Sequence, residues 1–394
     1  MISLKIGIFG GTFNPPHNGH VRAARSAAER LQLDRLLVIP SAIPPHKALP
    51  EGSPTSRERL ELTYLAFQEV PCAEVCPIEV EEGGVSYTAD TLRTLRERYP
   101  GAQFFLIMGS DMFRTLDSWY SAETVLRLAT PAVLSRGTKD DKDIAECAAK
   151  YKERFGADAV VIGNAITEVS STELRQQLRE RRGVEMFSDA VYSAIIARRY
   201  YGAKPSFDWL REKSYAMVLE KRIPHIKGCE REAVALAERW GGDVEAARES
   251  AILHDMTKYM PLREQLHVLD EYGIMADEME RADVKLLHAK TAAAIARARF
   301  GVPDDVYNAI FWHTTGRPGM SLLEKIIYMA DYIEPTRDFE GVETLRRLCY
   351  EDLDKATAEG LRMSIIDMKS RGIVPHPRTE EALRWLMAES GMKG

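Results

Sequence analysis

Two histidines lie three positions apart behind a short apolar run, in the segment "GIFGGTFNPPHNGH" (residues 7–20). Imidazoles at the start of a helix can donate hydrogen bonds to phosphate oxygens. The preceding Gly10 and Gly11 let backbone amides approach a ligand, and the N-terminus of the following helix attracts anions. His17 and His20 could instead form a zinc pair or cap the helix. No cysteine or acidic third ligand lies nearby in sequence, so phosphate contact is favoured.

A second reactive cluster centres on His254 and Asp255, which are neighbours in the apolar helical segment "AILHDMTK" (residues 251–258). Such a pair can bind a hard or borderline cation, and an aspartate can bridge two cations. Four further candidate ligands lie on separate segments: His225, His288, His313 and Asp331. A helical bundle can bring distant ligands together in its interior. A lone buried histidine is more often a core residue, so the predicted metal site depends on all six positions together.

The first half of the chain alternates strand-like and helix-like patterns. Strands are predicted over residues 4–9, 35–39, 103–108, 131–135 and 159–162. Helices are predicted over residues 18–31, 55–68, 88–99 and 140–155. This alternation predicts βαβ units, and therefore an α/β fold with a parallel sheet covered by helices on both faces.

The pattern changes after Tyr201. The segment "GAKPSFDW" (residues 202–209) carries the Gly and Pro of a linker, and from Leu210 onward one helical pattern follows another. The sequence therefore predicts an α/β domain over residues 1–203 and an all-α domain over residues 208–394.

Composition narrows the class of protein. The 394 residues are enough for two domains, and 45% hydrophobic with 28% charged residues is typical of a soluble globular chain. The net charge of −6 argues against nucleic acid as a partner. The five cysteines form no CxxC pair, so neither a disulfide framework nor a cysteine zinc site is expected. Without a signal-like or membrane-spanning apolar run, we expect a cytoplasmic protein with no membrane partner.

The segment "GGTFNPPHNGH" resembles the HxGH signature of the nucleotidyltransferase superfamily, and specifically of the bacterial nicotinate mononucleotide adenylyltransferases. Further motifs occur in that family's order: "PPHK" (44–47), "SYTADTL" (86–92), "GSDMF" (109–113), Trp119 and "SSTELR" (170–175). The resemblance covers about residues 1–200. It implies a Rossmann-like domain that transfers the adenylyl group of ATP to nicotinate mononucleotide, in NAD biosynthesis, and releases pyrophosphate.

The resemblance also implies roles for individual residues. The residues implied to bind ATP are Gly10, Gly11, Thr12, His17, His20, Ser171, Thr172 and Arg175, with His17, His20 and Arg175 counted as catalytic. "SST" before Glu173 also reads as a helix N-terminus, where Arg175 adds fixed positive charge. The attacking phosphate is already ionised, so catalysis should come from alignment and charge stabilisation, with Mg²⁺ on the triphosphate.

On the acceptor side, the implied ligands are Lys47, Thr88, Asp111, Trp119 and Arg136. An indole can stack on a pyridine ring, and a carboxylate can bind ribose hydroxyls. Two departures stand out: Asn14 occupies a position where many members have Asp, and "SRGT" replaces an Arg-Pro-Gly around Arg136. An adenylyltransferase for another acceptor, such as phosphopantetheine, is the alternative. "PPHK" and the complete His-x-Gly-His favour the nicotinate acceptor.

The order H…HD…H…H…D resembles the HD-domain metal-dependent phosphohydrolases. "LLHAK", "HTTG" and "ADYIEPTRDF" resemble the branch that cleaves diadenosine tetraphosphate symmetrically into two ADP. The resemblance spans about residues 208–390. It implies one metal held by His225, His254, Asp255 and Asp331, and a second held by Asp255, His288 and His313. Iron or manganese suits such mixed imidazole and carboxylate ligands, and Asp255 is counted as catalytic.

Lys258 and Arg337 are expected to neutralise substrate phosphate in this second domain, whereas His267 and His376 lie outside the pattern and are expected at the surface. The expected small-molecule partners are ATP, nicotinate mononucleotide and diadenosine tetraphosphate, and homo-oligomerisation is left open. Two alternatives remain for the second domain: a regulatory module that binds nucleotides or metals without turnover, and a hydrolase of another nucleotide such as guanosine tetraphosphate.

Overall fold

The chain separates into two compact units, Met1–Lys204 and Pro205–Gly394. The computed structural model describes residues 3–45, 48–135, 137–163 and 170–389. Within these residues, no helix combines the length and the apolar composition needed to cross a membrane.

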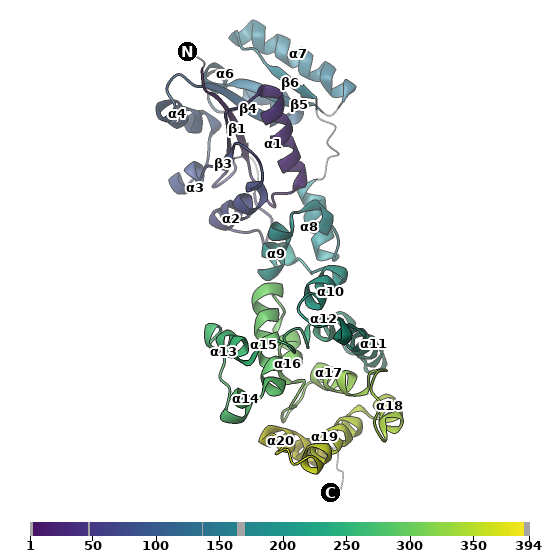
Figure 1. Ribbon diagram of the computed structural model, residues 1–394. Helices are drawn as coiled ribbons and strands as arrows, with labels where there is room; N and C mark the ends of the chain where they lie inside the picture. The colour runs from purple at the N-terminus through teal and green to yellow at the C-terminus, as the bar shows by residue number, and fades with distance from the viewer. Residues whose placement is uncertain (1–2, 46–47, 136, 164–169, 390–394) are drawn as a thin grey trace. The chain divides into compact units, whose positions relative to one another are not determined.

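Six described strands of the N-terminal unit form one sheet in the order β3-β2-β1-β4-β5-β6, and every pairing is parallel. The strands are β1 (Lys5–Gly11), β2 (Arg35–Pro40), β3 (Ala73–Val75), β4 (Gln103–Gly109), β5 (Thr130–Ser135) and β6 (Val160–Gly163). Helices connect the strands and lie along the sheet (Figure 1). Central strands covered on both faces read as continuous apolar runs, which is why "RLLVI" and "QFFLIM" were visible as strands.

The helices of this unit are α1 (Asn18–Leu31), α2 (Ser56–Phe67), α3 (Ile78–Glu82), α4 (Thr88–Arg98), α5 (Ser110–Arg114), α6 (Ala122–Leu128), α7 (Thr138–Phe155), α8 (Ser171–Arg179) and α9 (Asp189–Ala197). The predicted α/β class with a parallel sheet is confirmed. The shortest elements, among them β3 and α3, were not predicted, because three to five residues are too few to show a periodicity.

Strand β1 runs two residues further than the predicted 4–9, since Gly10 and Gly11 still lie opposite Ile39 and Pro40 of β2. Helix α1 then begins at Asn18, as predicted. The glycine pair is therefore the last part of the central strand rather than a free loop, and the ladder fixes its backbone.

His17 is the N-cap of α1, and its Nδ1 accepts a hydrogen bond from the Gly19 amide at 3.1 Å. His20 closes a capping box, because its Nδ1 accepts from the His17 amide at 3.3 Å. A Cβ at Gly19 would lie 2.9 Å from the His17 ring, so only glycine leaves room for this cap. Burial, with a smaller contribution from Arg22, lowers the pKa of His17 to about 4.

The C-terminal unit is all-α, as predicted (Figure 1). Its helices are α10 (Phe207–Tyr215), α11 (Ile223–Trp240), α12 (Val244–Leu253), α13 (Leu262–Glu271), α14 (Glu278–Ala282), α15 (Val284–Phe300), α16 (Asp304–Trp312), α17 (Leu322–Ile333), α18 (Val342–Glu351), α19 (Leu353–Ser370) and α20 (Pro377–Glu389). Helix α11 packs against α12 and α17, and α15 packs against α16.

The predicted linker over residues 202–209 is wrong at its C-terminal end, because α10 begins at Phe207. Trp209 is buried and packs edge-on against Phe300 of α15, with ring centroids 5.6 Å apart. Proline and glycine correctly indicated a boundary, but the aromatic residues that follow already belong to the helical core.

We expect His17 to make stability depend on pH. Its pKa rises from about 4 in the folded chain to about 6.5 on unfolding, so the unfolded chain binds more protons between these values. Stability present above pH 6.5 is therefore lost as the pH falls toward 4, by up to about 3 kcal/mol from this group. The His17→Asn variant keeps a capping acceptor without titrating.

Urea denaturation at pH 7 and pH 4.5 measures the effect. The wild type should lose more unfolding free energy than His17→Asn over this interval. The histidines other than His17 and its neighbour His20 titrate alike in both proteins, so the difference reports on this coupled pair. Equal losses in the two proteins would contradict the prediction.

Candidate active sites

A cavity of about 520 Å³ opens at the carboxyl ends of β1 and β4. The strand order reverses between these two strands, and ligands of open parallel sheets bind at such a point. The predicted site residues that line the cavity are Gly10, Gly11, Thr12, His20, Thr88 and Trp119. A Cβ at Gly10 would meet no protein atom within 4 Å, so the backbone there faces open space.

The His17 and His20 rings lie next to each other, with centroids 3.8 Å apart and planes tilted by 37°. Burial and the neighbouring His17 hold the pKa of His20 well below its usual value, so both imidazoles are neutral at pH 7. Because each Nδ1 accepts from a backbone amide, each proton must reside on Nε2. His20 lines the cavity and can donate from Nε2, whereas His17 is buried and is not among the lining residues.

Arg175 of α8 is buried and supports the loop between β1 and α1. Its guanidinium donates to the Asn14 carbonyl at 2.8 Å and to Thr172 Oγ1 at 2.9 Å. The Tyr201 hydroxyl donates to Asn14 Oδ1 at 2.8 Å, and Asn14 Nδ2 donates to Ser53 Oγ at 2.9 Å. The Asn14 side chain thus acts as both acceptor and donor, which a carboxylate at this position would not do.

One part of the cavity lining is aromatic. Trp119 and Thr88 line it together with Tyr87 and Tyr120, whose ring centroids lie 4.7 Å apart. Glu79 also lines the cavity and accepts from Thr91 Oγ1 at 2.7 Å. Burial raises the pKa of Glu79 despite hydrogen bonds that favour its charged form. A planar ring could stack here, with few charged groups around it.

Other predicted residues of this domain do not line the cavity. Asp111 is exposed in the first turn of α5, and Ser171 and Thr172 lie at the start of α8. Lys47 and Arg136 lie outside the described residues, so their placement stays a prediction.

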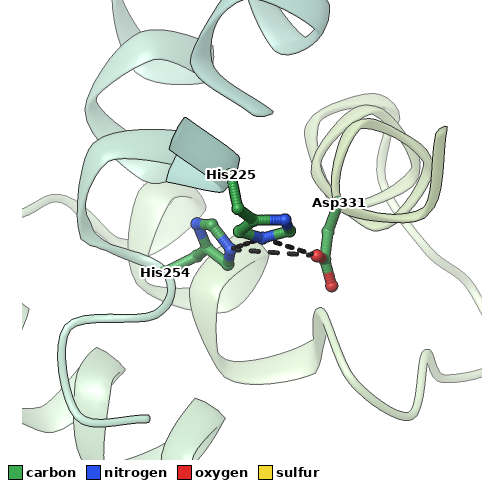
Figure 2. Close-up of side chains that lie close together, drawn as sticks. All are labelled: His225, His254 and Asp331. Carbon is green, nitrogen blue, oxygen red and sulfur yellow. Dashed lines mark hydrogen bonds and ion pairs between the residues drawn. The ribbon is translucent and has the colours of Figure 1, made fainter. Parts of the chain in front are cut away.

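The second site lies among the helices of the C-terminal unit, where the six predicted ligands form one connected cluster. His225 belongs to α11, His254 and Asp255 follow α12 directly, His288 belongs to α15, His313 follows α16, and Asp331 belongs to α17. Figure 2 shows the side chains of His225, His254 and Asp331 pointing toward one another. His225 Nε2 lies 3.0 Å from Asp331 Oδ1 and 3.4 Å from His254 Nε2.

The fully buried Asp255 connects this trio to the other two histidines. Its Oδ2 lies 3.5 Å from His254 Nε2 and 3.6 Å from His225 Nε2. Its Oδ1 lies 3.0 Å from His288 Nε2 and 3.8 Å from His313 Nε2. The two carboxylate oxygens therefore face two different groups of imidazoles.

Acceptors behind three of the rings fix their orientation. His225 Nδ1 bonds to Glu334 Oε1 at 2.9 Å, and the Nδ1 atoms of His254 and His313 bond to carbonyl oxygens at 2.7 Å. A Cβ at Gly228 of α11 would lie 2.5 Å from Glu334 Oε2, so glycine is needed for this approach. With each Nδ1 acting as donor, each Nε2 presents a lone pair to the centre.

Three cations surround the two carboxylates. Arg222 Nε donates to Asp255 Oδ2 at 2.6 Å, and Lys258 Nζ lies 3.5 Å from Asp255 Oδ1. Arg337 Nη2 donates to Asp331 Oδ1 at 2.6 Å. Burial alone would raise the pKa of Asp255 and of Asp331, but the surrounding imidazoles and cations hold both pKa values well below the usual range.

This donor set fits divalent cations. Burial lowers the pKa of His254, His288 and His313 to about 4, so these rings are neutral ligands at pH 7. Asp255 Oδ1 is buried and, among the described residues, has no hydrogen-bond partner of good geometry. Neutral imidazoles around ionised carboxylates suit iron, manganese or zinc rather than calcium or magnesium.

The expectation that His376 lies at the surface is wrong, whereas His267 is exposed as expected. His376 is buried, and its Nε2 lies 2.8 Å from Asp277 Oδ2. Glu280 stands beside them and is paired with the buried Lys290 ammonium at 2.6 Å. This cluster holds the α14 region against the segment before α20, and Lys290 pairs with one of its two carboxylates.

The sequence analysis did not identify Arg222 and Glu334. Arg222 precedes His225 by three residues, and Glu334 follows Asp331 by three, so each lies one helical turn from a predicted ligand. That spacing could have found both.

Comparison with known proteins divides the chain in the same way. Residues 8–179 match the cytidylyltransferase-like family, and residues 222–336 match the HD domain family. A protein of Dictyoglomus thermophilum, named "Probable nicotinate-nucleotide adenylyltransferase", is 42% identical over 200 residues, which are 50% of this chain and all of the relative. One of the same name from Gemmatimonas aurantiaca is 34% identical over 203 residues, 51% of this chain and 94% of the relative.

The second half has relatives of its own. The "Bis(5'-nucleosyl)-tetraphosphatase, symmetrical" of Bacillus subtilis is 36% identical over 185 residues, which are 46% of this chain and 99% of that protein. The chain therefore belongs to two families at once: its first half is a nicotinate-nucleotide adenylyltransferase domain of the cytidylyltransferase-like family, and its second half is an HD-domain hydrolase related to the symmetrical tetraphosphatases.

Proposed function

We propose that the chain is a bifunctional enzyme. Residues 1–203 would transfer the adenylyl group of ATP to nicotinate mononucleotide, giving deamido-NAD and pyrophosphate. Residues 208–394 would hydrolyse diadenosine tetraphosphate to two ADP. The observation that carries the proposal is that each unit gathers its own set of reactive groups: the cavity at the end of β1, and the six imidazoles and carboxylates around Asp255.

In the first reaction, a phosphate oxygen of nicotinate mononucleotide attacks the α-phosphorus of ATP, and the bond from that phosphorus to the bridging oxygen of pyrophosphate breaks. The attacking phosphate is ionised at pH 7, so no side chain has to remove a proton. The chain's contribution is alignment and charge stabilisation.

We assign the donor side to Gly10, Gly11, Thr12 and His20, whose Nε2–H can donate to the triphosphate that Mg²⁺ accompanies. His17 would act from behind by holding the start of α1 and the ring of His20. Thr88 and Trp119 would hold the acceptor ring. We also assign contacts with the acceptor to Lys47, Asp111 and Arg136. Arg175, with Ser171 and Thr172, would close on the phosphates from α8.

In the second reaction, the six ligands would hold two divalent cations, with Asp255 contributing one oxygen to each. His225, His254 and Asp331 would complete one site, and His288 and His313 the other. Iron or manganese bound there would supply Lewis acidity, which lowers the pKa of water and neutralises phosphate charge. Lys258 and Arg337 lie at the rim, 26% and 34% exposed, and can receive the outer phosphates of the substrate.

For the first activity, we expect His20→Ala to lower kcat for deamido-NAD formation by roughly 100-fold, because a donor to developing phosphate charge is lost. A coupled pyrophosphate assay with ATP and nicotinate mononucleotide measures the effect, and the hydrolysis of diadenosine tetraphosphate by the same variant should be unchanged. Pyrophosphate release by the wild type from ATP with phosphopantetheine, but not with nicotinate mononucleotide, would contradict the acceptor assignment.

For the second activity, we expect His254→Ala to lose both metal and diadenosine tetraphosphate hydrolysis, because one of the two imidazole donors around Asp255 Oδ2 and Asp331 is removed. Metal content and ADP formation with Mn²⁺ or Fe²⁺ measure this, and adenylyl transfer should be retained. Wild-type protein that binds metal and forms no ADP would indicate a regulatory module or a different nucleotide substrate.

Glu334 should tune the metal site without touching the metal. Glu334→Ala removes the acceptor of the His225 Nδ1 proton, so we expect metal affinity to fall by roughly 10- to 100-fold. A metal titration followed by calorimetry measures the change. Glu324→Ala is the matched control, because Glu324 is equally buried on α17 but pairs with Arg317. An equal loss of affinity in the control would rule out an effect through His225.

A further inference from the structure

Arg59 of α2 is fully buried, with 0% of its surface exposed. Arginine is almost never fully buried unless it is paired with an acid. Among the described residues, no carboxylate forms an ion pair with Arg59, and its Nε has no hydrogen-bond partner. Burial lowers the pKa of its guanidinium, yet arginine remains charged at pH 7. The charge therefore needs a reason to be there.

The guanidinium connects two loops that end neighbouring strands. Nη1 donates to the Thr12 carbonyl at 2.6 Å, in the loop after β1. Nη2 donates to the carbonyls of Ser41 and Ala42 at 2.8 and 2.7 Å, in the loop after β2. One planar group thus fixes the separation of the two loops.

Both loops border the cavity. Gly10, Gly11 and Thr12 line it on one side, and Ser41 lines it on the other. The Ala42 amide also donates to Ser86 Oγ at 3.1 Å, and Ser86 lines the cavity two residues before Thr88. A chain of contacts therefore runs from the proposed ATP loop, through Arg59, to the proposed acceptor loop.

We propose that Arg59 is a positioning residue for adenylyl transfer. It sets the spacing between the ATP-binding loop at Thr12 and the acceptor side of the cavity, which is formed by the loop at Ser41 and the segment at Ser86. The inference rests on the proposed function of this cavity. In-line attack requires the two substrates to be held at a fixed separation, and a misplacement of about 1 Å can cost about 100-fold in rate. The cation also lies behind the loop that would receive the triphosphate, so its uncompensated charge favours the bound anion.

The planar shape of the Arg59 guanidinium, with two terminal nitrogens that donate in different directions, matters as much as its charge. A lysine at this position would keep the positive charge but carries a single nitrogen, which cannot hold the Thr12 carbonyl and the two carbonyls after β2 in one plane. Arg59→Lys therefore separates the two contributions. Arg59→Met removes both while keeping most of the apolar bulk.

Arg96 of α4 provides a matched control. Its Nη1 and Nη2 donate to the carbonyls of Ala102 and Leu128 at 2.6 and 2.7 Å, so it too joins two segments through main-chain oxygens, the loop before β4 and the end of α6. Neither carbonyl belongs to a residue that lines the cavity. Arg96→Met should cost stability without changing the spacing of the substrate loops.

The test compares wild type, Arg59→Lys, Arg59→Met and Arg96→Met in the full chain, with kcat and both KM values for ATP and nicotinate mononucleotide and with the affinity for Mg²⁺-ATP by calorimetry. Urea denaturation reports the stability of each variant. We expect Arg59→Met to lower kcat by roughly 100-fold and to raise both KM values, with Arg59→Lys intermediate. Arg96→Met should keep the wild-type constants.

A folded Arg59→Met with wild-type kcat would overturn the inference, as would an equal loss of kcat in Arg96→Met. If Arg59→Met does not fold, Arg59→Lys decides, and wild-type kcat in that variant overturns the proposal. A wild type without turnover would instead contradict the proposed function. The affinity for Mg²⁺-ATP still tests the positioning role then, because Arg59→Met should bind it more weakly than Arg96→Met does.

Discussion

The fully buried carboxylate of Asp255 constrains the arrangement of the C-terminal helices. An ionised carboxylate without water loses several kcal/mol of solvation unless partners replace it. Its neighbours come from the turn before α11, from α12 and α15, and from the end of α16: Arg222, His254, His288 and His313. A helix that moved away would leave charge uncompensated, so the fold and the ligand geometry are determined together.

The same constraint with the opposite sign operates in the N-terminal unit. Arg59 and Arg175 are buried cations whose described partners are main-chain carbonyls and a threonine hydroxyl rather than acids. Both donate to the loop between β1 and α1, at Thr12 and at Asn14. The loop is thereby held from behind, while the neutral His20 faces the cavity. Positive charge close to the loop and neutral donors at its surface suit a ligand that brings its own negative charge.

Much of the fold could be predicted from the sequence. Apolar runs such as residues 35–39 and 103–108 revealed the buried parallel strands, and the loss of such runs after Tyr201 revealed the change to helices. Residue types with few structural roles, such as "HD" in an apolar helix, predicted the cluster of imidazoles and carboxylates around Asp255. These patterns extend over a few neighbouring residues, so they can be recognised in a single sequence.

What could not be predicted depends on contacts between distant segments. Arg59 lies in a charged helical segment, and only the packing of α2 beneath two strand ends shows that it is buried. His376 was predicted to be exposed because the residues next to it in sequence give no indication of its partner Asp277, which is 99 residues away. The type of a charged or polar residue can be read from the sequence. Whether that residue is buried depends on which distant segment packs over it.

The two units differ in how each obtains its chemistry. The N-terminal cavity offers neutral donors, backbone amides and an aromatic wall, with no cluster of acids that would hold a metal ion among the described residues. The C-terminal cluster offers ionised carboxylates among neutral imidazoles. No described ligand of either group comes from the other unit, and the relatives of each half are matched over 94 to 100% of their own length by that half alone. Each of these two groups of described residues lies within one unit, and joining the halves fixes the ratio of the two units at one to one.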